Sequence, residues 1–357
     1  MLTQKGALTL SELSSQGDVW KQVIQTVDKE QQKIVPWFMK EGFTAVVFTG
    51  AGSSLNVARV CRRFFSDFTG VTSGCFPPSE IFAGLRLPFE DRRKTLVVLF
   101  SRSGATSEII WALQKLRPYP GVKTLLITPA TDSPAASLAD MTLLIPSAKE
   151  ESHTTTRAYT SSILAFKYLV SFLMKNANLY KEIRTLPDLF KVKQFQREIQ
   201  RVTSTKPTSA IICGNGINYG HAMEAANIIS KIAVIPAVAD YVSQMRHGIA
   251  AQCTPNTLAI MLVSDTMKKE EAEVLGELAS IRCHRLVICE QADNKIGSAD
   301  FVFELKSKLS EYTRDLLMIP ILHELGFYMS VQKGVNADKP KGVPFSVTFK
   351  EPYFAGK

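Results

Sequence analysis

The residues best suited to chemistry in this sequence form a polar turn, Ser101 to Thr106. The apolar run before it, residues 96–100, has the composition of a buried strand, and residues 108–113 have the pattern of an amphipathic helix. The first N–H groups of a helix lack partners within it and point toward the preceding turn. A strand, a hydroxyl-rich turn and a helix therefore predict a site for an anion such as phosphate. The alternative is an ordinary turn in which a serine or threonine caps the helix.

A second turn of this kind, residues 50–54, reads Gly-Ala-Gly-Ser-Ser and follows an earlier apolar run, residues 44–49. It precedes a helical pattern over residues 55–68. If the two strands are neighbours in a parallel sheet, both turns lie at its carboxyl edge and can contact one phosphate. We therefore predict a phosphate site that consists of Gly52, Ser53, Ser54, Ser101, Arg102, Ser103 and Thr106.

A dinucleotide is the rival ligand, because residues 50–52 begin like the GxGxxG fingerprint. The third glycine is missing, however, and no convincing acidic ribose ligand follows a second strand. The sequence also lacks a P-loop, a GxSxG elbow and an HExxH helix. Phosphate binding by the serine turns is the better interpretation. We expect no cofactor and no metal.

The composition limits the class of protein. With 357 residues, 45% hydrophobic and 21% charged, the chain is long enough for one large or two medium globular domains. No apolar run reaches the ~20 residues of a membrane span, and the N-terminus has no signal-peptide pattern. Six cysteines without a CxxC pair indicate reduced thiols and a cytoplasmic protein. The net charge of +9 is scattered, which favours anionic small molecules over nucleic acid.

The second half of the chain repeats the first. Residues 44–58 align with residues 208–222, and residues 95–103 align with residues 257–265. These landmarks keep their order and nearly their spacing, which predicts two copies of one unit of alternating strands and helices, each with a parallel sheet. Further elements predicted are helices over residues 8–40, 133–138 and 158–173, strands over 123–128 and 141–145, and a charged helical connection over 175–206.

The two copies differ in their turns. The second half has Ile217 where the first has Ser53, and residues 264–266, Ser-Asp-Thr, where the first has Ser-Arg-Ser. A carboxylate at Asp265 repels phosphate, so we predict an anion site in the first half only.

The motifs FTGAGSS and LFSRSGATSE resemble those of the SIS (sugar isomerase) domain family, in which such turns hold the phosphate of a sugar phosphate. The resemblance covers about residues 35–350 and is greatest to the isomerase half of glucosamine-6-phosphate synthase and its stand-alone deaminase and deglycase relatives. It implies two doubly wound parallel-sheet domains in tandem, a homodimer and a phosphorylated sugar as partner, without nucleic acid or membrane. The implied division is a helical segment 1–34, SIS domains 35–180 and 200–347, and a tail 348–357.

The same resemblance assigns the remaining site residues. The segment 151–159 is similar to the family segment that lines the sugar, which implicates His153 and Thr154. Residues 245–248, Met-Arg-His-Gly, are similar to the family's Lys-His-Gly turn, which makes His247 the acid/base candidate. The alternative for His247 is a structural role after a helix.

Two catalytic positions of the family are changed in this sequence. The family carboxylate base lies sixteen residues before the histidine, where this chain has Lys231. Glu224 lies seven residues earlier, on the same face of a helix. The synthase also has a lysine before its Ser-Val-Thr, where this chain has Phe345. Lys231 is therefore a candidate base or Schiff-base lysine, or a cation paired with Glu224, and Glu224 is a displaced base or a helix-face carboxylate.

The resemblance implies an isomerase, deaminase or deglycase that acts on an amino-sugar or ketosamine (fructosamine-type) phosphate. Only about 35 residues precede the first SIS strand, so we expect no glutaminase domain. The alternative function is a non-catalytic sugar-phosphate regulator or sensor that keeps the anion site and has lost the carboxylate base.

Overall fold

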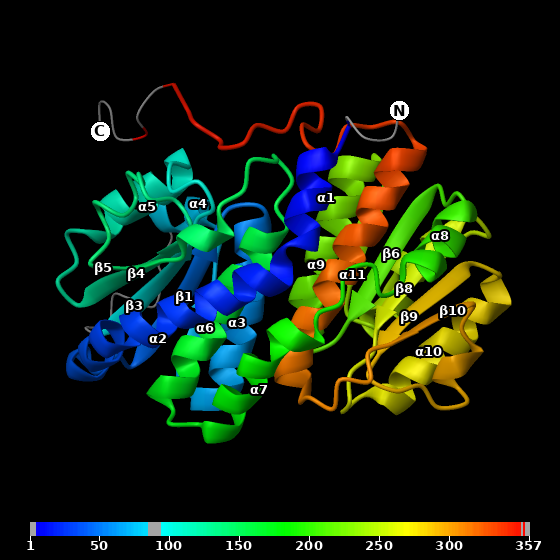
Figure 1. The fold of residues 1–357 in the computed structure, drawn as a ribbon, viewed down its shortest axis with the longest axis horizontal. Helices are drawn as coiled ribbons and strands as arrows, with labels where there is room; N and C mark the ends of the chain where they lie inside the picture. The colour runs from blue at the N-terminus through cyan, green and yellow to red at the C-terminus, as the bar shows by residue number, and fades with distance from the viewer. Residues whose placement is uncertain (1–4, 85–93, 351–352, 354–357) are drawn as a thin grey trace. The chain divides into compact units, whose positions relative to one another are not determined.

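The structure of the protein is a computed structural model, and it describes residues 5–84, 94–350 and 353. It forms two compact units, each built from separate pieces of the chain (Figure 1). Each unit contains one five-stranded parallel sheet, which confirms the predicted pair of α/β units with a helical N-terminus. Within the described residues, the first unit comprises 18–150, 157–184 and 344–357, and the second comprises 1–17, 151–156 and 185–343.

The first sheet has the strand order β2-β1-β3-β4-β5, and every neighbouring pair is parallel. The four strands predicted from apolar runs are present with small shifts at their ends. The edge strand β2 was not predicted, because its four residues include a glycine and none of them is buried. The strands are β1 Ala45–Gly50, β2 Thr72–Cys75, β3 Thr95–Phe100, β4 Val122–Thr128 and β5 Met141–Leu144.

Successive side chains of a strand point to opposite faces of the sheet, so both faces carry apolar side chains, and helices cover both. Val47, Val97 and Leu99 pack in one core cluster with residues of α4 and α5. On the other face, the rings of Phe48 and Phe100 lie 5.3 and 6.1 Å from that of Phe166 in α6. The helical elements are α2 Gln16–Glu41, α3 Ser53–Thr69, α4 Pro78–Phe82, α5 Ser107–Leu116, η1 Pro146–Ala148, α6 Arg157–Leu173 and α7 Ala177–Leu189.

Three predicted helices differ in the structure. The helical segment over residues 8–40 is interrupted near Ser15, and the helical connection predicted over 175–206 consists of α7 and α8 (Gln196–Ser204). The segment 133–138 is a turn and not a helix. The Ser133 hydroxyl accepts the Ala136 N–H, as an N-cap would. Most backbone bonds that follow, such as that from the Ala136 N–H to the Ser133 carbonyl, span only three residues, so turns form instead of an α-helix.

The second unit repeats this topology with the order β10-β9-β8-β6-β7, again parallel throughout. Position for position, β6 corresponds to β1 and β8 to β3, as the sequence alignment of the halves predicts. The edge strand β7 corresponds to β2. The strands are β6 Ser209–Gly214, β7 Ala237–Asp240, β8 Thr257–Leu262, β9 His284–Cys289 and β10 Phe301–Glu304.

On one face of the second sheet, α10 contributes Val274, Leu275 and Leu278 to a core cluster with strand residues. In Figure 1, α9 and α11 run side by side, and they are in contact. The helical elements are α1 Ala7–Ser14, α8 Gln196–Ser204, α9 Asn218–Ile228, the π-helix η2 Ile229–Ala233, η3 Gln244–His247, η4 Ile249–Gln252, α10 Lys268–Ile281, η5 Ile296–Ser298 and α11 Glu311–Gln332.

Membrane helices, metal clusters and thiols are assessed for residues 5–84, 94–350 and 353 alone. No helix there combines the length and the apolar character that crossing a membrane requires. No group of three or more His, Cys, Asp or Glu side chains there is arranged to hold a metal ion. All six cysteines carry free thiols.

Candidate functional site

The two serine turns begin at neighbouring positions in the first sheet. β1 and β3 are hydrogen-bonded parallel neighbours in which Gly50 lies opposite Phe100, so both turns leave the same carboxyl edge. In the order β2-β1-β3-β4-β5 the chain reverses direction across the sheet at this pair of strands. Ligands of open parallel sheets bind in the crevice at such a switch point. The predicted adjacency of the two strands is therefore confirmed.

The first turn is tight because glycine occupies the end of β1. A Cβ atom on Gly50 would lie 2.4 Å from the Ser54 carbonyl oxygen, so no other residue fits there. Gly52 has a φ of +59°, which is in the region that favours glycine. The Ser54 N–H donates to the Ala51 carbonyl at 3.1 Å. Ser53 is buried and Ser54 half-buried, and both lie in the first turn of α3, where anions are stabilised.

In the second turn two hydroxyls organise the backbone. The Ser101 hydroxyl accepts the Gly104 N–H at 3.1 Å, and the Ser103 hydroxyl accepts the Ala105 N–H at 3.2 Å. Each oxygen accepts here, so each hydroxyl can still donate to another acceptor, and the Ser346 hydroxyl already lies 3.0 Å from that of Ser103. The hydroxyl of Thr106, the residue before α5, lies 3.4 Å from that of Ser103. The turn therefore presents hydroxyl donors at a helix N-terminus.

The Arg102 guanidinium makes its contacts within the first unit. It lies 3.6 Å from the buried carboxylate of Glu150, and it donates to the Phe345 carbonyl at 2.8 Å. It also lies 4.2 Å from the centre of the Phe345 ring, which is a cation–π contact. The resemblance predicts lysine at this position, and here the Phe345 ring packs on the Arg102 guanidinium instead.

His153 and Thr154 lie in the second unit. The Thr154 hydroxyl donates to the Ala337 carbonyl at 2.6 Å. Nδ1 of His153 donates to the Val343 carbonyl at 2.8 Å, since a carbonyl can only accept. Both residues thus hold the segment that leads into the C-terminal tail, a role that the sequence pattern did not predict.

Glu224 is fully buried in α9, so it is not a helix-face carboxylate in solvent. Its Oε1 lies 3.9 Å from Nε2 of His323 in α11. A second buried pair joins the same two helices, with Nε2 of His221 2.9 Å from Oδ2 of Asp315. Burial, followed by the charges of Lys231 and His221, lowers the pKa of His323 to about 3, so this imidazole is neutral at pH 7. The sequence pattern did not predict this group of four ionisable side chains, which consists of Glu224, His323, His221 and Asp315.

Lys231 lies on the π-helix that continues α9, not on the α-helix that the spacing assumed. The wider turn rotates Lys231 relative to Glu224, so the seven-residue spacing no longer places them strictly on one face. The element ends at Val234, whose φ of +51° is unusual for a β-branched residue. Single-turn π-helices are frequent at functional sites. Lys231 is half-buried, and its charge acts on His323.

His247 is exposed at the end of η3, and Gly248 follows it. The preceding residue, Arg246, lies 2.7 Å from Glu277 and 3.7 Å from Glu273, which fastens the turn to α10. His247, Lys231 and Glu224 all belong to the second unit. Glu224 is buried and His247 is exposed, so the two side chains lie in different environments.

The equivalent turn of the second unit is occupied by the chain's own carboxylates. Glu271 accepts the Ser264 N–H at 2.8 Å, the Ser264 hydroxyl at 3.0 Å and the Asn215 amide at 2.9 Å. Glu311 accepts the Asp265 N–H at 3.2 Å. The prediction that the second half binds no anion rested on the carboxylate of Asp265, which in the structure pairs with Arg314. Glu271 and Glu311 are the groups that use the donors of this turn.

We expect Glu271 to make the second unit more stable at pH 5 than at pH 8. Burial raises the pKa of Glu271 from 4.5 to about 7, so the folded state holds its proton more tightly than the unfolded state. Stability therefore falls as the pH rises from 4.5 to 7, by on the order of 3 kcal/mol. Glu271→Gln should flatten the dependence of the free energy of unfolding on pH, measured by urea denaturation, whereas Glu270→Gln, at an exposed neighbour, should not. Equal slopes in both variants would contradict this assignment.

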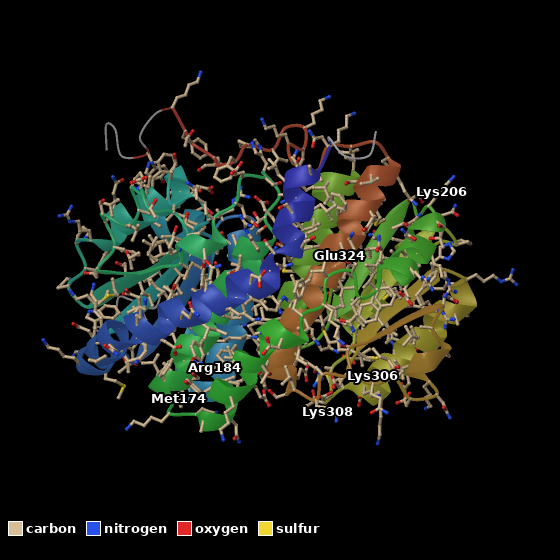
Figure 2. The ribbon with its side chains drawn as sticks, viewed as in Figure 1. Met174, Arg184, Lys206, Lys306, Lys308 and Glu324 are labelled. Carbon is tan, nitrogen blue, oxygen red and sulfur yellow. The ribbon has the colours of Figure 1, made fainter. Side chains whose placement is uncertain are left out.

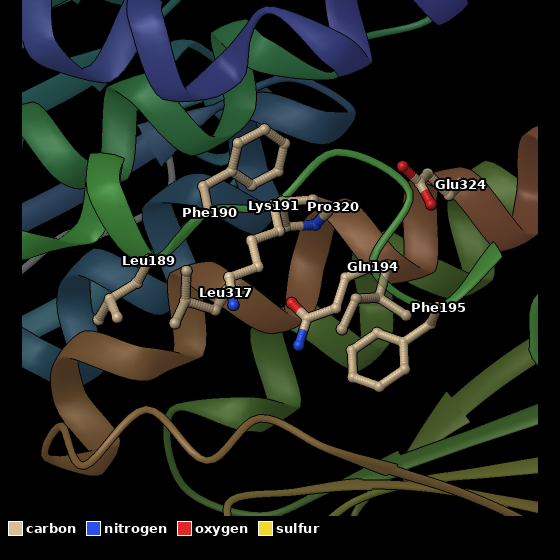
Figure 3. Close-up of a pocket in the computed structure, with 9 residues that line it drawn as sticks. Leu189, Phe190, Lys191, Gln194, Phe195, Leu317, Pro320 and Glu324 are labelled. Atoms are coloured by element: carbon tan, nitrogen blue, oxygen red, sulfur yellow. The ribbon is translucent and has the colours of Figure 1, made fainter.

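A pocket in the second unit offers no comparable chemistry. It lies between the segment 189–195 and α11, and Figure 3 shows apolar side chains along most of it. Its charged groups Lys191 and Glu324 lie at opposite ends in that view. The lysines labelled in Figure 2 also do not gather, since Lys206 lies at one end of this unit and Lys306 and Lys308 at the other.

The fold, the repeat and the serine turns at the switch point define a protein of the SIS domain class. The chain belongs to the SIS domain family, whose model matches residues 44–172 and 205–308, more than half of the chain.

Particular relatives are enzymes of sugar-phosphate metabolism by name. The chain is 26% identical to the isomerizing glutamine–fructose-6-phosphate aminotransferase of Pyrococcus horikoshii over 95% of this chain and 57% of that protein. It is 25% identical to the same enzyme of Streptococcus mutans over 95% of this chain and 58% of the relative. The chain thus spans less than two thirds of these relatives.

Solved structures share the fold. A putative tagatose-6-phosphate ketose/aldose isomerase from Clostridium novyi has a TM-score of 0.84 at 18% identity, with 98% of this chain and 95% of that one covered. A glucosamine-6-phosphate deaminase from Thermotoga maritima has a TM-score of 0.75 at 20% identity, with 92% and 100% covered. At 18–20% identity these structures show that the fold is shared.

Proposed function

We propose that this chain is a cytoplasmic isomerase, deaminase or deglycase that acts on an amino-sugar phosphate or a ketosamine phosphate. The observation that carries the proposal is the pair of serine turns at the switch point between β1 and β3. Ser53, Ser54, Ser103 and Thr106 provide donors there at two helix N-termini, which suits the phosphate of such a substrate. The names of the relatives and structural neighbours point to the same class of substrate.

The proposed chemistry needs groups that move protons at carbon and oxygen. Moving a carbonyl between C1 and C2, or releasing an amine, requires a base for a carbon-bound proton and stabilisation of an enediol or enolamine. We assign the acid/base role to His247. Lys231 acts as the base or as a Schiff-base amine at the position where the family has a carboxylate. Glu224, buried beside His323, acts as a positioning group for Lys231.

The proposed division of the chain follows the repeat. Residues 35–180 and 200–347 are the two SIS domains, residues 1–34 are a helical segment, and residues 348–357 are a tail. Of these, residues 1–4, 85–93, 351–352 and 354–357 lie outside the described residues.

A sugar-phosphate sensor without activity is the second candidate, and the observation that favours it is the loss of the family carboxylate at Lys231. A thermal-shift screen of hexose, hexosamine and fructosamine 6-phosphates, followed by assays of ammonia or amine release on the hits, separates the two. A ligand that binds and is never turned over would establish the sensor.

Ser103→Ala is expected to weaken binding of the sugar phosphate by about tenfold or more, because a donor to a charged group contributes on the order of 1.5–3 kcal/mol. Isothermal titration calorimetry measures the effect. Thr266→Ala is the control, because it removes an exposed hydroxyl from the corresponding turn of the second unit. In crystals soaked with phosphate, we expect the ion at Ser103 and not at Asp265. Unchanged affinity in Ser103→Ala would remove the site from this turn.

A further inference from the structure

We propose that Cys253 and Cys283 form a redox modification site, which a hydroperoxide converts into a disulfide. The two residues come from different parts of the second unit, since Cys253 follows η4 and Cys283 lies between α10 and β9. Cys283 is buried in the core cluster that α10 forms with the strands, and Cys253 packs against the same cluster. Their thiol groups lie within hydrogen-bonding reach of each other. The two sulfur atoms are therefore neighbours before any oxidation.

The two cysteines differ in their access to solvent. Cys253 is half-buried, and its neighbours Gln252 and Thr254 are exposed, so a small oxidant can reach its sulfur from solution. Cys283 is only 3% exposed. Redox-sensing sites commonly combine an accessible cysteine, which is oxidised first, with a second cysteine beside it that resolves the product. This pair has that arrangement.

Their pKa values differ in the direction that this chemistry needs. Hydrogen bonding by Cys283 lowers the pKa of Cys253, and partial burial opposes the effect. Hydrogen bonding with Cys253, followed by burial, raises the pKa of Cys283, so the proton stays on the buried sulfur. Burial raises the pKa of Cys75 to about 11 and that of Cys213 to about 12. Because the thiolate is the nucleophile, Cys253 is the most reactive of these four thiols.

The neighbouring groups favour this pair over another. Cys213 in β6 belongs to the same cluster, but its thiol donates to Sδ of Met245 at 3.7 Å. The Cys283 thiol donates to the Leu278 carbonyl at 3.6 Å. A thiolate at Cys253 is a stronger acceptor than that carbonyl, so the Cys283 proton turns to Cys253 once Cys253 ionises. Cys283 is therefore the thiol that meets an oxidised Cys253.

The oxidation proceeds in two steps. The Cys253 thiolate attacks one oxygen of the hydroperoxide, the O–O bond breaks, and the leaving oxygen takes a proton from water. The sulfur loses two electrons and becomes a sulfenic acid, while the peroxide is reduced to an alcohol or to water. The Cys283 sulfur then attacks that of Cys253, so the S–S bond forms and the S–O bond breaks. The hydroxide that leaves takes the Cys283 proton as water, and a dithiol reductant reverses the change.

The test treats the full chain with hydrogen peroxide, alkylates the remaining thiols and maps the peptides by mass spectrometry. We expect one link, between the peptides of Cys253 and Cys283, which dithiothreitol removes. Iodoacetamide should modify Cys253 in the untreated chain about tenfold or more faster than Cys75 near neutral pH. Cys75 is the matched comparison, because it is half-buried like Cys253 but its pKa is raised.

Variants identify the role of each sulfur. Cys283→Ser keeps a hydroxyl donor, so Cys253 should still be oxidised but should stop at the sulfenic acid, which dimedone traps. Cys253→Ser should leave Cys283 unoxidised, and Cys75→Ser should form the link as the wild-type chain does. Circular dichroism shows whether each variant is folded.

The wild-type peptide map decides the inference even if a variant does not fold. Absence of a link after peroxide treatment, or a link from Cys253 to Cys213, would overturn it. Equal alkylation rates at Cys253 and Cys75 would overturn it as well, because Cys253 would then not be the reactive thiol.

Discussion

Replacing His247 by Asn is expected to lower turnover by about 10²–10⁴, the usual effect of losing an acid/base group, with little change in sugar-phosphate affinity. His247 is exposed on η3 and directly precedes Gly248 in the turn that resembles the family's Lys-His-Gly. Asn fills a similar volume and hydrogen-bonds, but it cannot exchange a proton near neutral pH. The rate of amine or ammonia release at saturating substrate measures the loss.

His284→Asn is the control, since His284 lies in β9 and belongs to neither candidate catalytic group. Full activity in His247→Asn would assign the residue a structural role and move the search for the acid/base elsewhere. The resemblance to the synthase also implies a homodimer in which this turn reaches toward a neighbouring site. Light scattering that finds only monomer at micromolar concentration would contradict that arrangement.

Replacing Asp315 by Ala is expected to lower the free energy of unfolding by about 3–5 kcal/mol. Asp315 is fully buried, and its Oδ2 lies 2.9 Å from Nε2 of His221, which is buried as well. Removing one member of a buried pair forfeits their attraction but leaves the desolvation cost of the other. Urea denaturation followed by circular dichroism measures the loss.

Asp67→Ala is the matched control, because the Arg63–Asp67 pair has a similar separation of 2.8 Å but is partly exposed. Such surface pairs contribute about 0–1 kcal/mol. If Asp315→Ala does not fold, Asp315→Asn, which keeps an acceptor near His221, should fold with a smaller loss. Equal and small losses in Asp315→Ala and Asp67→Ala would show that the buried pair contributes no more than a surface one.

The sequence by itself was sufficient for the parts of the protein that depend on local pattern. Strands β1 and β3 are continuous apolar runs, and each is followed by Gly and Ser residues that force a turn. Because the same run and turn recur in the second half, the repeat and the parallel sheets follow from periodicity alone. Local pattern failed at residues 133–138, which form turns with mostly three-residue backbone bonds instead of the predicted helix.

Only the tertiary structure decided which groups occupy each turn, because those groups come from far along the chain. Ser346 reaches Ser103 across 243 residues, and His221 meets Asp315 across 94, separations for which sequence spacing carries no signal. The carboxylates of Glu271 and Glu311 look like ordinary first-turn helix residues in sequence. Folding brings them onto the turn of the second unit, residues 264–266, where they accept the Ser264 and Asp265 N–H groups.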